Sequence, residues 1–223
     1  MSHSTHRLGA AKLAAQIPVE QLEQCVSSLD ELQALLGEPV GRRPSPGGWA
    51  EVEQYVGSAL PSDFKAFLDA YGSGTLSSEL VVFHPHGPSP LLERMRKTHQ
   101  AFAERRDRVL GAGDLEHVPY PFHPEPGGLI SWGFDHSGDE HFFVPCGPDP
   151  DRWKIVTMAH EEGCETFDGP FSTFALAFVR RLLDVDRYHG IDPEALRYLE
   201  PEDLEELVAA GEIGPVQPSF ESF

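Results

Sequence analysis

The chain has 223 residues, 40% of them hydrophobic and 24% charged, which is the composition of a globular protein with one sizeable domain or two small ones. Seventeen basic side chains stand against 36 acidic ones, so the formal net charge at pH 7 is −19. This charge argues against nucleic acids and anionic membranes as partners and favours a cationic partner. An acidic surface that only maintains solubility is the alternative explanation.

The termini and the cysteines point to a compartment. No run of 18 apolar residues occurs, and residues 1–16 lack the apolar core of a signal peptide. Cys25, Cys146 and Cys164 are odd in number and form no CxxC pair, so we expect no disulfide framework. The sequence therefore predicts a cytoplasmic protein.

The first half of the chain is rich in helical patterns. Residues 18–36 carry valine and leucine at helical spacing and predict a helix that ends before Gly37. A linker rich in Pro and Gly follows. The stretch from Trp49 to Gly74 then predicts two short helices, separated at Leu60-Pro61 and ended at Tyr71-Gly72.

A strand over Glu79–Phe83 is expected next, and a basic helix over Leu91–Leu110 after it. This helix has 6 basic and 3 acidic side chains. Most of its arginines are expected on the face opposite its apolar stripe, which consists of Leu91, Met95, Thr98, Phe102 and Val109. Such a basic patch either binds an anion or pairs with the protein's own carboxylates.

The following part is expected to be rich in strands. Residues 129–134 and 140–144 read as a hairpin around the polar turn 135–139, and 153–158 as a further strand. Residues 174–184 predict a helix, and 202–210 a short one within a segment whose end, 211–223, is expected to be mobile.

This order of elements predicts an α+β fold with a mainly antiparallel sheet flanked by helices. We expect an N-terminal helical extension and linker over residues 1–45 and the α+β domain over 46–186. An acidic C-terminal tail with a short helix follows over 187–223, and from Asp184 onwards 11 acidic side chains stand against 2 arginines.

Histidine, cysteine and serine side chains are the candidates for catalytic or metal-binding groups. His136 and His141 flank the hairpin turn, and Ser137 lies between His136 and Asp139, but neither reproduces the spacing of a zinc site or a triad. No HExxH, G-x-S-x-G or P-loop motif occurs. We therefore expect no cofactor, no metal and no enzymatic activity.

Acidic turns are the candidate partner-binding site. Asp135, Asp139 and Glu140 belong to the hairpin, and Asp149 and Asp151 to the next loop. If both loops lie at the same edge of the sheet, the five carboxylates converge and would steer a cationic protein. The alternative is that turns need Asp and Gly for their own geometry.

Several of these segments together resemble the SUKH superfamily, the SMI/KNR-type proteins, over roughly residues 49–183. The long basic helix and both terminal segments depart from the common core of that family. The resemblance rests on Trp49 with Glu51 and Val52, Leu60-Pro61, Asp63-Phe64, Phe67-Leu68, Tyr71-Gly72-x-Gly74, Trp132-Gly133 with Asp135, Gly138-Asp139 and Trp153.

The resemblance implies a SUKH-like α+β domain with a binding role and brings no catalytic motif with it. Bacterial members are similar to immunity proteins that neutralise polymorphic toxins by occluding them, and fungal relatives act as scaffolds. We therefore expect a non-catalytic, toxin-neutralising protein whose partner is a cationic toxin domain. The alternative is a regulatory or scaffold protein that binds an endogenous partner through its extra helices. The oligomeric state stays open.

Nine large side chains are expected to be buried in one core. They are Trp49, Leu60, Phe64, Phe67, Tyr71, Trp132, Trp153, Phe174 and Phe178.

Overall fold

The structure is a computed structural model, and it describes six stretches of the chain. The predicted helix over 202–210 and most of the acidic tail lie outside them. The described residues are 19–37, 45–77, 79–110, 120–159, 163–179 and 219–222.

Seven strands form one sheet in the order β6-β5-β4-β3-β2-β1-β7, and each strand is antiparallel to its neighbours. With the helices that flank it, this sheet makes the chain an α+β protein, as the sequence predicts. The strands are β1 (Gly74–Leu76), β2 (Leu80–Val82), β3 (Ile130–Asp135), β4 (Glu140–Val144), β5 (Lys154–Ala159), β6 (Gly163–Phe167) and β7 (Phe220–Ser222).

Five α-helices are found in the described residues, and they confirm the helical periodicity of the sequence. Gly57 and Gly72 end two of them with φ of 78° and 85°, a backbone region that favours glycine. The last helix begins at Phe171, three residues before the predicted start. The helices are α1 (Val19–Leu36), α2 (Trp49–Val56), α3 (Ser62–Tyr71), α4 (Leu91–Leu110) and α5 (Phe171–Val179), with a short 3₁₀ turn η2 (Pro150–Arg152).

The main core lies between one face of the sheet and the helices α3 and α5. Phe64 is at its centre, where its ring packs edge-on against Trp132, Phe143 and Phe171 at centroid distances of 5.0–6.1 Å. All nine side chains predicted for the core are buried in this cluster, which confirms that prediction.

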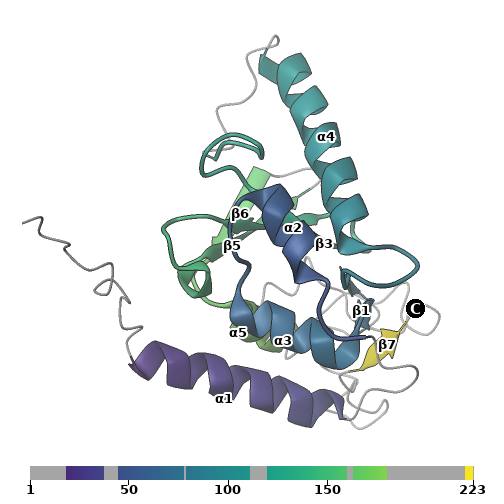
Figure 1. Cartoon of the computed structure of the whole chain (residues 1–223), viewed down its shortest axis with the longest axis vertical. Helices are drawn as coiled ribbons and strands as arrows, with labels where there is room; N and C mark the ends of the chain where they lie inside the picture. Colours follow the sequence, from purple (N-terminus) through teal and green to yellow (C-terminus); the bar gives the residue numbers. More distant parts are fainter. Residues whose placement is uncertain are drawn as a thin grey trace, which may run out of the picture.

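Helix α1 packs beside α3 and α5, as Figure 1 shows along the lower edge of the molecule. Leu32 is fully buried in the main core. Two hydrogen bonds fix the helix: the Tyr71 hydroxyl donates to Gly37 O at 2.7 Å, and the Thr173 hydroxyl to Ser28 Oγ at 3.0 Å. The predicted N-terminal extension therefore shares the core of the α+β domain through α1.

The opposite face of the sheet is covered by α4 and by the loop 120–129. In Figure 1, α4 rises well beyond the strands that it covers. Phe102 of α4 packs against Phe122 and Phe142 at centroid distances of 5.3 and 5.2 Å. The side chains buried in this smaller core are Phe122, Leu129, Phe142, Val144 and Val156.

Three strands were not predicted, and one of them corrects the expectation of a mobile C-terminus. Residues Phe220–Ser222 form β7, which pairs with β1 at the edge of the sheet. The Phe220 ring packs against Phe67 and Tyr71 at 5.7 and 5.1 Å. The end of the chain therefore contributes to the main core. None of the described helices is long and apolar enough to cross a bilayer.

Candidate functional site

The two aspartates of the hairpin turn are buried, although residues 136–138 between them are exposed. Asp135 and Asp139 are 1% and 4% exposed. The Asp139 N–H donates to Asp135 Oδ1 at 3.1 Å, and the Asp135 N–H donates to Asp139 O at 2.9 Å. Gly138 completes the turn with φ of 93°. The Asp135 carboxylate and the backbone of Asp139 therefore shape the turn, as the alternative interpretation of the sequence proposed.

The second acidic loop lies at the other end of β4, so the five carboxylates do not converge. The turn before β4 and the loop after it lie at opposite ends of this strand, and therefore at opposite ends of the sheet. Asp149 Oδ1 accepts from Asp151 N at the start of η2, and Asp151 Oδ1 accepts from Ser62 N at 2.5 Å. The expectation of one acidic edge is wrong.

Asp135 also belongs to a buried polar chain. The fully buried ring of His141 places Nε2 3.3 Å from Asp135 Oδ2 and Nδ1 2.9 Å from Thr157 Oγ1. This ring stacks on Trp132 at 5.2 Å. The three groups follow the order of a catalytic triad, but the ring and Asp135 are at most 1% exposed and Thr157 only 4%. Burial at this depth assigns them to the fold rather than to a substrate.

A second histidine–aspartate pair connects α3 to the end of β2. His84 is fully buried, and its Nε2 donates to Asp69 Oδ1 at 3.1 Å. The same oxygen accepts from Gly47 N at 2.9 Å and from Trp49 Nε1 at 3.1 Å. Burial alone would raise the pKa of Asp69, but these hydrogen bonds lower it below its usual value. This pair anchors the chain that enters α2.

A narrow, closely packed recess lies between α4 and β3, and of its lining residues only Arg94, Phe134 and Glu140 are partly exposed. Arg94 lies across it, with its guanidinium carbon 5.1 Å from the Phe83 ring centre and 4.9 Å from that of Phe134. Its Nε is buried and has no hydrogen-bond partner among the residues that the structure describes. The residues that line the recess are Phe83, Leu91, Arg94, Met95, Thr98, Ser131, Trp132, Gly133, Phe134 and Glu140.

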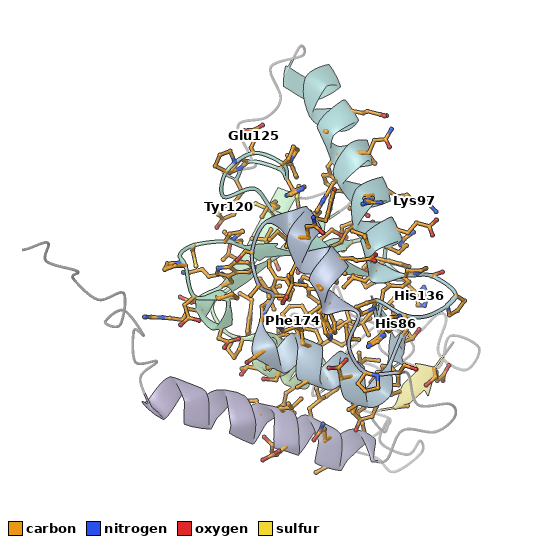
Figure 2. All side chains as sticks on the ribbon, in the orientation of Figure 1. His86, Lys97, Tyr120, Glu125, His136 and Phe174 are labelled. Atoms are coloured by element: carbon orange, nitrogen blue, oxygen red, sulfur yellow. The ribbon has the colours of Figure 1, made fainter. Side chains whose placement is uncertain are left out.

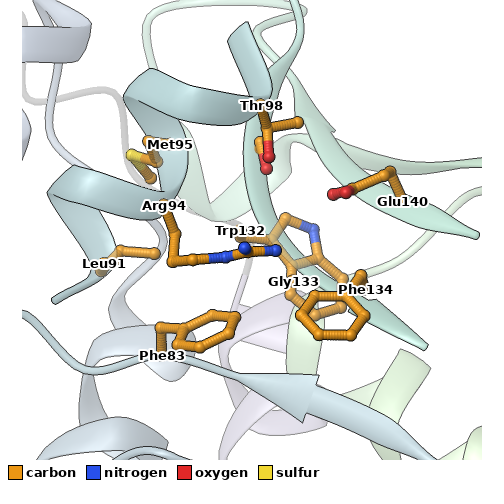
Figure 3. A pocket seen from close by; sticks show the side chains of 10 residues that line it. Phe83, Leu91, Arg94, Met95, Thr98, Trp132, Gly133, Phe134 and Glu140 are labelled. Atoms are coloured by element: carbon orange, nitrogen blue, oxygen red, sulfur yellow. The ribbon is translucent and has the colours of Figure 1, made fainter. Parts of the chain in front are cut away.

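Glu140 faces Arg94 across this recess, and Figure 3 shows the two side chains pointing into it from opposite sides. Burial raises the pKa of Glu140 to about 7, the Arg94 cation acts against this shift, and the Asp135 carboxylate adds to it. Near neutral pH the recess therefore offers a cationic donor beside a carboxyl group that changes its charge. Of the five predicted site residues, Glu140 is the one that lies at this recess.

Arg94 was not among the site residues predicted from the sequence, because most arginines of the basic helix were expected on the face opposite its apolar stripe. Arg94 directly precedes Met95 of that stripe, and Leu91, Met95 and Thr98 are buried as predicted. At the border between the apolar and polar faces of a helix, a long side chain can lie along the sheet with its charged end near solvent.

The described part of the chain offers few features of a metal site or of a reactive cysteine. No three histidine, cysteine or carboxylate side chains there are arranged to hold a metal ion. Cys146 is exposed, and burial raises the pKa of the Cys164 thiol, which disfavours its thiolate.

Comparison of the chain with protein-family models, with curated proteins and with solved structures finds no match in any of the three.

Proposed function

We propose that this chain is a non-catalytic, cytoplasmic protein-binding domain of the immunity type, which neutralises a toxin domain by occluding it. The resemblance to the SUKH superfamily supports the proposal from the sequence. Its motif residues Trp49, Phe64, Phe67, Trp132 and Trp153 lie together in the main core. They account for the fold and leave the binding surface to other residues.

The observation that carries the proposal is the Arg94 recess. Arginine and aromatic side chains dominate the binding energy of protein interfaces. Here an arginine is already held in place by two phenyl rings, so binding would order little further side-chain entropy. Arg94 offers donors and Glu140 a carboxyl group, which together suit the polar groups of a partner's backbone or side chain.

The net charge supports a basic partner. A charge of −19 attracts a cationic protein over the range of a Debye length, about 8 Å at physiological salt. The charge and the recess therefore have separate roles: the first speeds encounter, and the second holds the complex.

Growth rescue tests the proposal. The toxic C-terminal domain of a large secreted protein encoded beside this gene is co-expressed with the full chain, with Arg94→Ala or with Arg152→Ala. Arg152 is an exposed arginine of η2 and serves as the matched control. We expect wild type and Arg152→Ala to restore growth. Arg94→Ala should bind the toxin domain about 10- to 100-fold more weakly, as an anchor residue would.

Failure of the wild-type chain to rescue growth from any such neighbour would overturn the immunity proposal. The scaffold alternative would then be tested through α1, whose Leu35 is 39% exposed beside the buried Leu32. An endogenous partner that binds wild type and is lost in Leu35→Asp would favour that alternative.

A further inference from the structure

A second polar cluster lies on the other flank of α4, around the buried His99. His99 is 4% exposed, and the Ser131 N–H donates to its Nε2 at 3.0 Å. A nitrogen that accepts a hydrogen bond carries no proton of its own, so the neutral ring must carry its proton on Nδ1. Burial, with a smaller contribution from His123, lowers the pKa of His99 to about 3, so the ring is neutral at pH 7.

This tautomer determines the direction of the next hydrogen bond. His99 Nδ1 lies 3.0 Å from the Tyr55 hydroxyl oxygen. Because Nδ1 carries the proton, it donates and the Tyr55 oxygen accepts. The hydroxyl hydrogen of Tyr55 is then left to donate elsewhere. Burial raises the pKa of Tyr55, so the phenol keeps this hydrogen at neutral pH.

Two further polar side chains pack against the Tyr55 ring. The Arg96 guanidinium carbon lies 5.3 Å from the Tyr55 ring centre, and within the described residues Arg96 makes no ion pair. The His123 ring lies 4.7 Å from the Tyr55 ring and 4.7 Å from that of His99. Helix α2, helix α4 and the loop 120–129 thus each contribute one polar side chain to a single cluster around the Tyr55 ring.

We propose that Tyr55, Arg96 and His123 form a binding site for a single oxyanion, the carboxylate of an acidic group or a phosphate. Within the described stretches, the phenol hydrogen of Tyr55 has no acceptor and Arg96 has no counter-ion, so both would gain from an oxyanion. Charge-assisted hydrogen bonds are the stronger kind. This site gives Arg96, a second arginine of the basic helix, a role that the recess does not. It is independent of the proposed toxin binding, because it lies on the flank of α4 away from Arg94.

The proposal is tested by NMR titration of the ¹⁵N-labelled full chain, in which the amide chemical shifts are measured. The two probes, used separately, are inorganic phosphate and N-acetyl-glutamate amide. The variants are Tyr55→Phe and Arg96→Gln. Their matched controls are Tyr120→Phe, a tyrosine bonded to Thr166 at 3.1 Å, and Lys97→Gln, whose side chain pairs with Glu93. Figure 2 shows Lys97 on the opposite side of α4 from Tyr120.

We expect saturable shifts of amides near Tyr55 and His123, with the dissociation constant raised about tenfold or more in both variants and unchanged in both controls. The probe that binds more tightly identifies the oxyanion as phosphate or carboxylate. Absence of binding by both probes, or equal affinity in variants and controls, would overturn the site. Tyr55→Phe removes the acceptor of His99 and can impair folding, so Arg96→Gln, at an exposed position, decides the question in that case.

Discussion

Burial decides what the acidic residues of the β3–β4 turn do. In sequence, Asp135 and Asp139 look like exposed charges of a polar turn. In the structure, Asp135 accepts a backbone hydrogen bond and lies beside His141, and both aspartates are nearly inaccessible. Charge reversal at these positions would place cations in the core and unfold the domain. Binding experiments should therefore change Arg94 and leave this pair intact.

Phe67 tests the main core at the scale of one residue. Its ring is fully buried and packs on Tyr71, Phe171 and Phe220. Phe67→Ala should lower the free energy of unfolding by about 3–5 kcal/mol, because it removes a large buried ring and leaves a cavity. Urea denaturation followed by tryptophan fluorescence measures the change. A loss below about 1 kcal/mol, within the range of surface substitutions, would contradict the position of this side chain.

Glu140 should make stability depend on pH. The unfolded chain releases this proton near pH 4.5, whereas the folded protein holds it until about pH 7. Between these values the folded state binds more protons, so the contribution of Glu140 to stability is complete below pH 4.5 and is lost as the pH rises through 7. Glu140→Gln stays neutral throughout. It should match wild type at pH 4.5 and exceed it at pH 8 by at most about 3 kcal/mol.

Urea denaturation of both proteins at the two pH values gives this difference directly. Comparison with the variant is needed because His99, whose pKa is lowered to about 3, acts in the opposite direction as the pH falls below 6.5. Glu165→Gln, at an exposed position of β6, is the control and should differ from wild type by less than about 0.5 kcal/mol. Equal stability of Glu140→Gln and wild type at pH 8 would contradict the prediction.

At the scale of elements, the long periodic helices could be predicted, whereas three of the seven strands, β1, β6 and β7, could not. Helices α1 and α4 each have an apolar stripe over five or more turns, and the structure places them where the sequence predicts. Strands β1 and β7 have three residues each, too few for an alternating pattern. Their existence depends on pairing between segments far apart in the chain, which no local pattern reveals.

Strand β7 offers a test at this scale, because a short edge strand has to be held by its side chains. Phe220 faces the main core and is half-buried, whereas Glu221 is exposed. Phe220→Ala should destabilise the protein by about 1–3 kcal/mol, less than Phe67→Ala because less surface is buried. Glu221→Ala, the neighbouring control, should stay within about 0.5 kcal/mol. Thermal denaturation measures the melting temperatures of both variants. Equal melting temperatures would contradict the pairing of β7 with β1.

At the scale of the whole molecule, the candidate site depends on how α4 crosses the sheet. The sequence predicted this helix and its apolar face. The rotation of α4 about its own axis places Arg94 against Phe134 on one flank and Arg96 against Tyr55 on the other. This rotation depends on contacts between three separate segments. The predicted acidic edge failed for a related reason, since its convergence required knowing at which end of β4 each loop emerges. Net charge needs no such geometry and could be read from the composition.

The net charge of −19 leads to a prediction about kinetics. If the partner is a basic toxin domain, unlike charges speed its encounter with this chain, and salt screens that attraction. The association rate constant should fall about tenfold between 50 and 500 mM NaCl, and the dissociation rate constant should change much less. Arg94→Ala should do the reverse, since a local anchor affects dissociation. Stopped-flow fluorescence measures both constants. An association rate that is independent of salt would mean that the charge serves solubility alone.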